Sequence, residues 1–451
     1  MRTRLTEETI LFVSIVKWFV LATVIGAVVG LSTTGFLRLL NWATGVTHQY
    51  DAFFLLLPAA LFVSALIVKY LAPDAEGHGT ENVIEAIHKR SGKIPVLVVP
   101  VKLVATIITL AIGGSAGKEG PCAQIGAGLS SLFADVFKFD DHDRKKLVIC
   151  GVSAGFAAVF GTPIAGSIFG VEVLFVGAIL YDVLLPSFIA GITGYQVSSA
   201  LGMTYFHHPV NVVPVFSESF LLTVALAGVF FGVCSLILIE ALKYGEKIAD
   251  RIHIWKPAKG LIGGLALVAL TVLFSKQFLG LGLETIEASL EGRDVVWYAF
   301  LVKPLFTAIT LAFGGSGGIV TPIFFTGATA GAAFALLFGL STATFSAIGL
   351  VSVLAGAANT PIAASILSVE LFGPAIAPFA TVACVISFLM TGHRSVYPSQ
   401  ILSVRKSPSL QVAVGEEIEH VTPSFQPRRT SLVRVLLGLA KRWEEMGKRN
   451  D

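Results

Sequence analysis

Long runs of apolar residues make up most of the chain, and short polar or glycine-rich segments separate them. The runs cover residues 10–40, 53–72, 96–137, 146–203, 215–242, 259–283, 295–340 and 343–392. A helix needs about 20 apolar residues to cross the hydrocarbon core of a bilayer, so the pattern predicts about ten or more membrane-spanning helices. The first run is too long for the core of a cleaved signal peptide, and the N-terminus lacks a small-residue cleavage site.

The composition supports this interpretation. Hydrophobic residues make up 54% and charged residues 14% of the chain, and the mean hydropathy is +0.80. In a soluble domain about a quarter of the residues are charged, so most of the outer surface here faces lipid. The net charge of +3 and the lack of a basic patch with interleaved aromatic residues argue against a nucleic-acid partner. We therefore predict an all-α polytopic membrane protein.

Basic residues and cysteines refine the picture. Lysine and arginine concentrate near the N-terminus, in residues 243–259 and in the tail beyond Arg405. By the positive-inside rule we expect both termini in the cytoplasm, with the chain in the cell membrane, which is the inner membrane in a Gram-negative cell. Residues 430–448 show the spacing of an amphipathic helix that lies on the membrane surface.

The four cysteines lie inside apolar runs without metal-type spacing, so we expect packing residues and neither a metal nor a cofactor.

The chain contains an internal repeat. Residues 110–121 read LAIGGSAGKEGP and residues 311–322 read LAFGGSGGIVTP, with seven of twelve positions identical. Residues 162–172 (TPIAGSIFGVE) match residues 360–370 (TPIAASILSVE) at eight of eleven positions. Any two apolar helices share scattered matches, but chance does not explain the polar residues and prolines in register, which are Lys102 with Lys303, Pro121 with Pro322 and Glu172 with Glu370.

The repeat predicts two homologous membrane halves. We place the N-terminal half at residues 1–242, a basic linker at 243–259, the C-terminal half at 260–403 and a cytoplasmic tail at 404–451. Duplicated halves are common in transport proteins and are often inverted relative to each other. The matching positions of Glu172 and Glu370 favour a structural role that both halves share.

A glycine-rich break interrupts each half. The segment GGSAGKEGP cannot continue a helix, because glycine disfavours helix interiors and proline suits the first turn of a new helix. A helix that starts near Gly120 and Pro121 presents free backbone N–H groups, which attract an anion. The copy at GGIVTP offers a second helix start, and EGHGTEN at residues 76–82 offers a third. Irregular backbone at membrane depth occurs only inside protein or along a polar cavity.

Glu119 is an ionisable residue inside the first break. Charged groups at membrane depth are costly and usually functional. An ionised carboxylate at this position competes with an anion for the same amides and leaves when it is protonated, so we interpret Glu119 as a gate. The alternative is a carboxylate that only caps its helix, which is worth about 1 kcal/mol. For Lys102 two roles stay open, which are raising the electrostatic potential of the pathway and pairing with a carboxylate.

These segments resemble the CLC family of chloride channels and chloride/proton antiporters, in the branch without CBS domains. GKEGP at residues 117–121 matches the family motif G-[K/R]-E-G-P, and GHGTE at residues 77–81 stands where the family has G-S-G-I-P. GGIVTP at residues 317–322 resembles G-G-x-F-x-P, and SVYPSQIL at residues 395–402 resembles the segment of the pore tyrosine. The resemblance implies two inverted halves of many tilted and broken helices, a homodimer and one anion pathway per subunit.

The resemblance also implies a set of site residues. The gate is Glu119, Lys102 contributes to the electrostatics of the pathway, and the anion-binding residues are His78, Gly79, Lys118, Gly120, Ile319, Val320 and Tyr397. Two of these depart from the family. His78 replaces a serine that coordinates the anion, and an imidazole is larger and can titrate. Val320 replaces a phenylalanine, although its backbone amide is still available to an anion.

The mode of transport depends on further departures. Family antiporters carry an internal glutamate immediately after the position of Glu172, and this chain has Val173 there. The fluoride-exporting branch has an acid before V-T-P in the third motif, where this chain has Ile319 before Val320. We therefore predict a chloride or small-anion channel, with a proton-coupled chloride or fluoride antiporter as the alternative. GGSAG and GGSGG also fit the serine-hydrolase motif, which leaves an intramembrane serine hydrolase as a remote alternative. That motif requires a strand-to-helix elbow in a soluble α/β domain, so no enzyme is predicted.

Overall fold

The computed structural model describes residues 2–205, 207–209 and 217–425. These residues form sixteen α-helices. The second eight show a succession of long and short helices similar to that of the first eight. The first eight are α1 (Arg2–Thr47), α2 (Leu57–Leu71), α3 (Thr80–Lys89), α4 (Val98–Ala111), α5 (Glu119–Val136), α6 (Asp141–Phe160), α7 (Pro163–Glu172) and α8 (Tyr181–Ala200). The second eight are α9 (Glu218–Arg251), α10 (Lys256–Leu273), α11 (Leu283–Leu290), α12 (Ala299–Ala312), α13 (Val320–Phe338), α14 (Thr342–Ala358), α15 (Pro361–Phe372) and α16 (Ala377–Met390).

The remaining elements are short. Five 3₁₀ helices lie between or after the α-helices, at η1 (Phe53–Leu56), η2 (Pro73–Ala75), η3 (Lys276–Phe278), η4 (Pro374–Ile376) and η5 (Ile418–His420). Strand β1 (Phe175–Val176) pairs in parallel with β2 (Ile401–Leu402), and β3 (Leu410–Gln411) pairs antiparallel with β4 (Ser424–Phe425). The β1–β2 pair joins the segment between α7 and α8 to the segment that follows α16.

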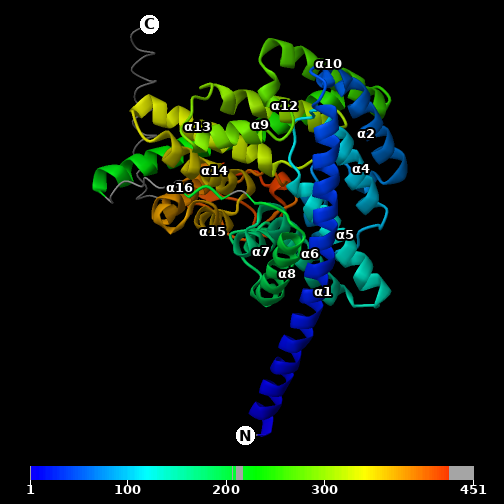
Figure 1. Ribbon diagram of the computed structural model, residues 1–451. Coiled ribbons are helices and arrows are strands. Elements are labelled where there is room, and N and C mark those ends of the chain that lie inside the picture. The colour runs from blue at the N-terminus through cyan, green and yellow to red at the C-terminus, as the bar shows by residue number, and fades with distance from the viewer. Residues whose placement is uncertain (1, 206, 210–216, 426–451) are drawn as a thin grey trace.

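By length and composition, the described residues contain five helices that can cross a membrane. They are Thr6–Thr47, Phe53–Leu71, Glu218–Arg251, Lys256–Leu273 and Val320–Phe338, and five shorter apolar helices accompany them. Five is fewer than the ten or more that the apolar runs predict, because glycine and proline divide those runs. The run at 96–137, for example, becomes α4 and α5 with a break between them. Figure 1 shows α1 as a long helix whose N-terminal end projects beyond the other helices.

Reciprocal hydrogen bonds relate the two halves by an approximate two-fold axis. The Ser115 amide donates to the Thr310 hydroxyl, and the Ser316 amide donates to the Thr109 hydroxyl, both at 3.0 Å. Such bonds connect equivalent positions of the repeat in both directions. The duplication that the sequence predicts therefore appears as a symmetric pair of bundles.

Glu172 and Glu370 form a second reciprocal contact. The Glu172 carboxylate accepts hydrogen bonds from the first-turn amides of α15, at Ile362 (3.0 Å) and Ala363 (2.7 Å). In the opposite direction, the Glu370 carboxylate accepts from the first turn of α7, at 3.0 and 2.8 Å. Each half thus caps a helix N-terminus of the other half, where a negative charge is favourable. This geometry agrees with the predicted structural role of both glutamates.

Replacing Glu172 with alanine is expected to destabilise the protein. The substitution leaves two amides in the first turn of α15 without an acceptor, and each such group costs about 1–3 kcal/mol when it is buried. We expect the free energy of unfolding to fall by about 2–6 kcal/mol. In a gel-filtration assay of heated, detergent-solubilised protein, the monodisperse peak should disappear at a lower temperature. Glu8→Ala, at an exposed position of α1, is the control. An unchanged melting temperature for Glu172→Ala would show that the hydrogen bonds of Glu172 to α15 do not stabilise the protein.

The segments on either side of the C-terminal half have defined positions. Residues 243–259, predicted as a linker, form the last turns of α9 and the start of α10. Beyond residue 403, the Lys406 ammonium donates to the Asn359 side chain and to the Phe388 carbonyl, both at 2.6 Å. The described part of the tail therefore packs against the membrane half. The amphipathic helix predicted at 430–448 lies outside the described residues.

Candidate functional site

The two glycine-rich breaks meet at the centre of the molecule. Gly117 and Gly318 exchange both backbone hydrogen bonds at 2.6 Å, in an antiparallel bridge. The approach requires glycine, because a Cβ atom on Gly318 would lie 2.7 Å from the Gly120 nitrogen and one on Gly120 would lie 2.1 Å from the His78 carbonyl oxygen. The helices after the breaks begin at Glu119 and Val320, and the third predicted start becomes α3 at Thr80.

The Glu119 carboxylate reaches across to the other half. Its side chain is buried, with 1% exposed, and it accepts a 3.2 Å hydrogen bond from the Thr321 amide and a short one from the Thr321 hydroxyl. Thr321 lies in the first turn of α13, so the carboxylate occupies the helix N-terminus where the sequence predicts an anion. Sequence reasoning missed Thr321, although the T-P pair at the start of a helix marks it as a candidate.

The predicted residues of the first motif and Tyr397 lie together. The His78 carbonyl is close to Gly120, and the His78 ring lies 5.7 Å from the Tyr397 ring, measured between ring centroids. The hydroxyls of Tyr397 and Thr80 face each other, yet neither has a hydrogen bond of good geometry within the described part of the chain. The buried Nδ1 atom of His78 also lacks a partner there. Buried polar groups normally have partners, so these three atoms are available to a ligand.

The remaining predicted residues surround the two helix starts. Lys118 is the N-cap of α5, and Ile319 is the N-cap of α13. The side chains of Ile319 and Val320 are both buried, and Val320 also lines a small apolar pocket. The structure therefore brings Gly120, Ile319 and Val320 to the same junction as Glu119. Lys118 lies at its edge, on the wall of a cavity that also contains Glu119.

Lys102 supports the segment that carries His78. Its buried ammonium donates to the carbonyl oxygens of Ala75 (3.1 Å) and Gly77 (2.5 Å). Lys303 repeats this pattern in the other half with Phe278 and Gly280. The pairing with a carboxylate that the sequence left open does not occur among the described residues, since backbone carbonyls fill this role. The Lys102 ammonium thus binds the carbonyl group of the residue that precedes His78, a predicted anion-binding residue.

Two cavities approach the junction. One of about 470 Å³, here called the Glu119 cavity, is lined by Glu119 and Thr321. Its wall also includes His207 and His208, which no sequence motif marked as part of a site. The other, of about 400 Å³ and here called the His78 cavity, reaches Gly77 and His78. The Glu119 cavity borders the segment that leads towards α9, whereas the His78 cavity is lined by the last turns of α9, at Ile239, Leu242, Lys243, Glu246, Lys247 and Asp250.

The position after Glu172 carries no acid. Val173 is buried, and its carbonyl accepts a 2.8 Å hydrogen bond from the Gln400 side chain. Both carboxylate oxygens of Glu172 accept hydrogen bonds from amides at the start of α15. Glu172 therefore has no oxygen without a partner. No cluster of three or more metal-ligating side chains occurs in the described ranges.

The breaks, the buried Glu119 carboxylate and the repeat all coincide with known features of one family. The sequence model of the voltage gated chloride channel family matches residues 59–392. The chain belongs to this family, the CLC family. Its fold is accordingly the CLC type, with two inverted homologous halves, and it is a membrane protein of anion transport.

Several CLC proteins are similar to it over most of their length. The chloride/fluoride channel protein of Pseudomonas syringae pv. tomato is 36% identical over 88% of this chain and 89% of its own length. The H(+)/Cl(-) exchange transporter ClcA of Klebsiella pneumoniae is 25% identical over 78% of this chain and 80% of its own. A crystal structure of a CLC-type fluoride/proton antiporter superposes with a TM-score of 0.82 and 29% identity, covering 86% of this chain and 98% of that one.

Proposed function

We propose that the protein conducts fluoride and chloride between the Glu119 cavity and the His78 cavity, with Glu119 as the gate. The contact between the Glu119 carboxylate and Thr321 carries this proposal. An anion and an ionised carboxylate compete for the same donors at the start of α13. When Glu119 takes up a proton, it loses its charge and releases the site to the anion. The open donors of His78 and Tyr397 then receive the anion on the other side of the gate.

The choice of anion follows from donors and relatives. Fluoride is the smallest halide and the strongest hydrogen-bond acceptor among them, and Thr321 offers an amide and a hydroxyl together. The Pseudomonas relative is described as a chloride/fluoride channel protein, and the similar crystal structure as a fluoride/proton antiporter. We also propose a homodimer with one pathway per subunit, in the cell membrane, with both termini in the cytoplasm.

The proposed mode is passive conduction, because Val173 and Ile319 supply no acid at the positions where coupled relatives carry one. Proton-coupled exchange is the second candidate, favoured by the similarity to the fluoride/proton antiporter. In that case Glu119 carries protons as well as closing the pathway.

Simultaneous flux measurements test both candidates. Purified protein in vesicles loaded with potassium fluoride, or with potassium chloride, is expected to release the anion once a potassium ionophore balances the charge. A pH electrode in the same chamber is expected to record no proton movement against a proton gradient. Uphill proton movement driven by the anion gradient would replace the channel by the exchanger. Efflux no faster than from protein-free vesicles would refute anion transport itself.

A further inference from the structure

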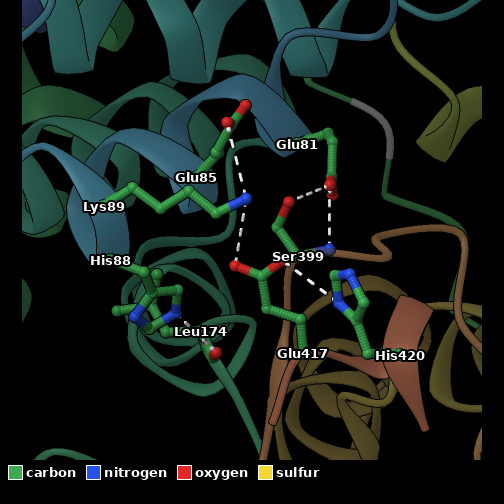
Figure 2. A network of polar contacts seen from close by, with 8 residues as sticks. All are labelled: Glu81, Glu85, His88, Lys89, Leu174, Ser399, Glu417 and His420. Atoms are coloured by element: carbon green, nitrogen blue, oxygen red, sulfur yellow. Dashed lines mark hydrogen bonds and ion pairs between the residues drawn. The ribbon is translucent and has the colours of Figure 1, made fainter.

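A carboxyl group that the proposed gate does not use lies near the His78 segment. Glu81, in the first turn of α3, accepts a 2.8 Å hydrogen bond from the Ser399 amide and a short one from the Ser399 hydroxyl. Both bonds end on its Oε1 atom, as Figure 2 shows. The Oε2 atom is buried and has no hydrogen-bond partner in the described part of the chain. One oxygen therefore anchors the side chain, and the other is free to carry a proton.

Glu81 and its partner Ser399 each lie close in sequence to a residue of the proposed pathway. It follows His78 by three residues, and its partner Ser399 follows Tyr397 by two. The Tyr397 hydroxyl lies within electrostatic reach of both Glu81 and Glu119. The two carboxyl groups whose charges act on Tyr397 are thus Glu119 and Glu81. A charge on Glu81 acts on any anion that this tyrosine holds.

Partly exposed charged groups lie near Glu81. Lys89 bridges the carboxylates of Glu85 (3.7 Å) and Glu417 (3.1 Å), and Figure 2 shows this network beside the Glu81–Ser399 contact. Glu85 and Glu419 are near enough to repel a negative charge on Glu81. The titratable and charged groups on the surrounding elements are Glu85, His88, Lys89, Tyr397, Glu417, Glu419 and His420, with Glu119 beyond the tyrosine.

We propose that Glu81 is a second protonatable group of the pathway and sets the response of anion flux to pH on the His78 side. The proposal rests on the proposed function. When Glu81 is ionised, its charge repels an anion at Tyr397, and protonation removes that repulsion. Loss of one charge within about 10 Å, at an effective dielectric constant of about 20, changes anion occupancy about tenfold. Acid on the His78 side therefore raises the flux by about this factor.

The variant Glu81→Gln separates this role from simple anchoring. Its carbonyl oxygen can still accept from Ser399, but the side chain cannot ionise. Ser399→Ala is the matched opposite, since it weakens the anchor and keeps the carboxyl group. Glu284→Gln is the control from the other half, because Glu284 also lies in the first turn of a short helix after a G-x-G segment but lines a different cavity. Glu81→Asp and Glu81→Asn repeat the comparison at a shorter length, and gel filtration checks that each variant is folded.

The measurement requires protein of one orientation. All four native cysteines are buried, so a Lys247→Cys background provides one reactive thiol in the His78 cavity. A membrane-impermeant thiol reagent outside the vesicles silences the molecules whose His78 cavity faces outwards. The lumenal pH then acts only on the His78 side of the molecules that remain active.

The expected result is specific to ionisation. Fluoride efflux by the background protein, Ser399→Ala, Glu284→Gln and Glu81→Asp rises as the lumen is acidified. Glu81→Gln and Glu81→Asn give high efflux that does not respond to lumenal pH and still responds to external pH. If Glu81→Gln titrates like the background protein from the lumenal side, the proposal is wrong. That outcome is distinct from failure of the proposed function, in which none of the proteins conducts.

Discussion

Glu119→Gln is expected to conduct anions at every pH at which the wild-type protein is closed. The amide side chain has the shape of the protonated carboxyl group and cannot become an anion. Hydrogen bonds to a charged group contribute about 1.5–3 kcal/mol and those between neutral groups about 0.5–1.5 kcal/mol. The contact with Thr321, which holds the gate at the start of α13, is therefore weakened by about 1 kcal/mol or more. Efflux at neutral pH should rise by about tenfold and lose its response to the pH on the side of the Glu119 cavity.

The control for this variant is Thr321→Val. This substitution removes the hydroxyl donor but keeps the charge on Glu119 and the backbone amide of residue 321. Efflux should therefore rise less and keep its dependence on pH. Fluoride and chloride efflux from vesicles, measured over a series of pH values for the three proteins, distinguishes these cases. Identical efflux from Glu119→Gln and wild type across the series would show that Glu119 is not the gate.

Gly120→Ala is expected to abolish transport. The added Cβ atom would lie 2.1 Å from the His78 carbonyl oxygen and 3.0 Å from the Gly318 Cα atom. Both neighbours are backbone atoms, so no change of rotamer relieves the overlap. The junction must open, which displaces the segment with His78 from the start of α5. We expect efflux below about a tenth of the wild-type value, because a shift of about 1 Å in a positioned site costs about a hundredfold in rate.

Gly35→Ala is the matched control for the junction variant. It lies within α1, where an added Cβ atom meets nothing within 4 Å, so efflux should stay at the wild-type level. Gel filtration of both variants separates loss of function from loss of folded protein. Wild-type efflux from folded Gly120→Ala would show that the close contact between Gly120 and His78 is not needed for transport.

The repeat made much of the fold predictable. Polar residues in register, such as Lys102 with Lys303 and Glu172 with Glu370, are contacts that both halves need, and they occupy equivalent places in the structure. The three helix starts were also predictable, since glycine and proline determine local backbone geometry. The number of long spanning helices was overestimated, because the count used the length of the apolar runs and not their division at glycine and proline.

Contacts between the halves could not be predicted from local patterns. The partner of Glu119 is Thr321, which lies 202 residues away and meets it only because the two-fold arrangement brings the breaks together. The same reason hides the cavity position of His207 and His208. For Lys102 the sequence left two roles open, and it gave no sign that the ammonium donates to the backbone carbonyls of a turn.

The reciprocal caps formed by Glu172 and Glu370 have a consequence for biosynthesis. The amide of Ala165 receives its acceptor from a residue 205 positions later in the chain. At about 5–20 residues per second, the ribosome needs roughly 10–40 s to supply that glutamate. The N-terminal half therefore waits in the membrane with the start of α7 uncapped, and Glu172 waits for the amides that it will bind. Both caps therefore form only after the second half has entered the membrane.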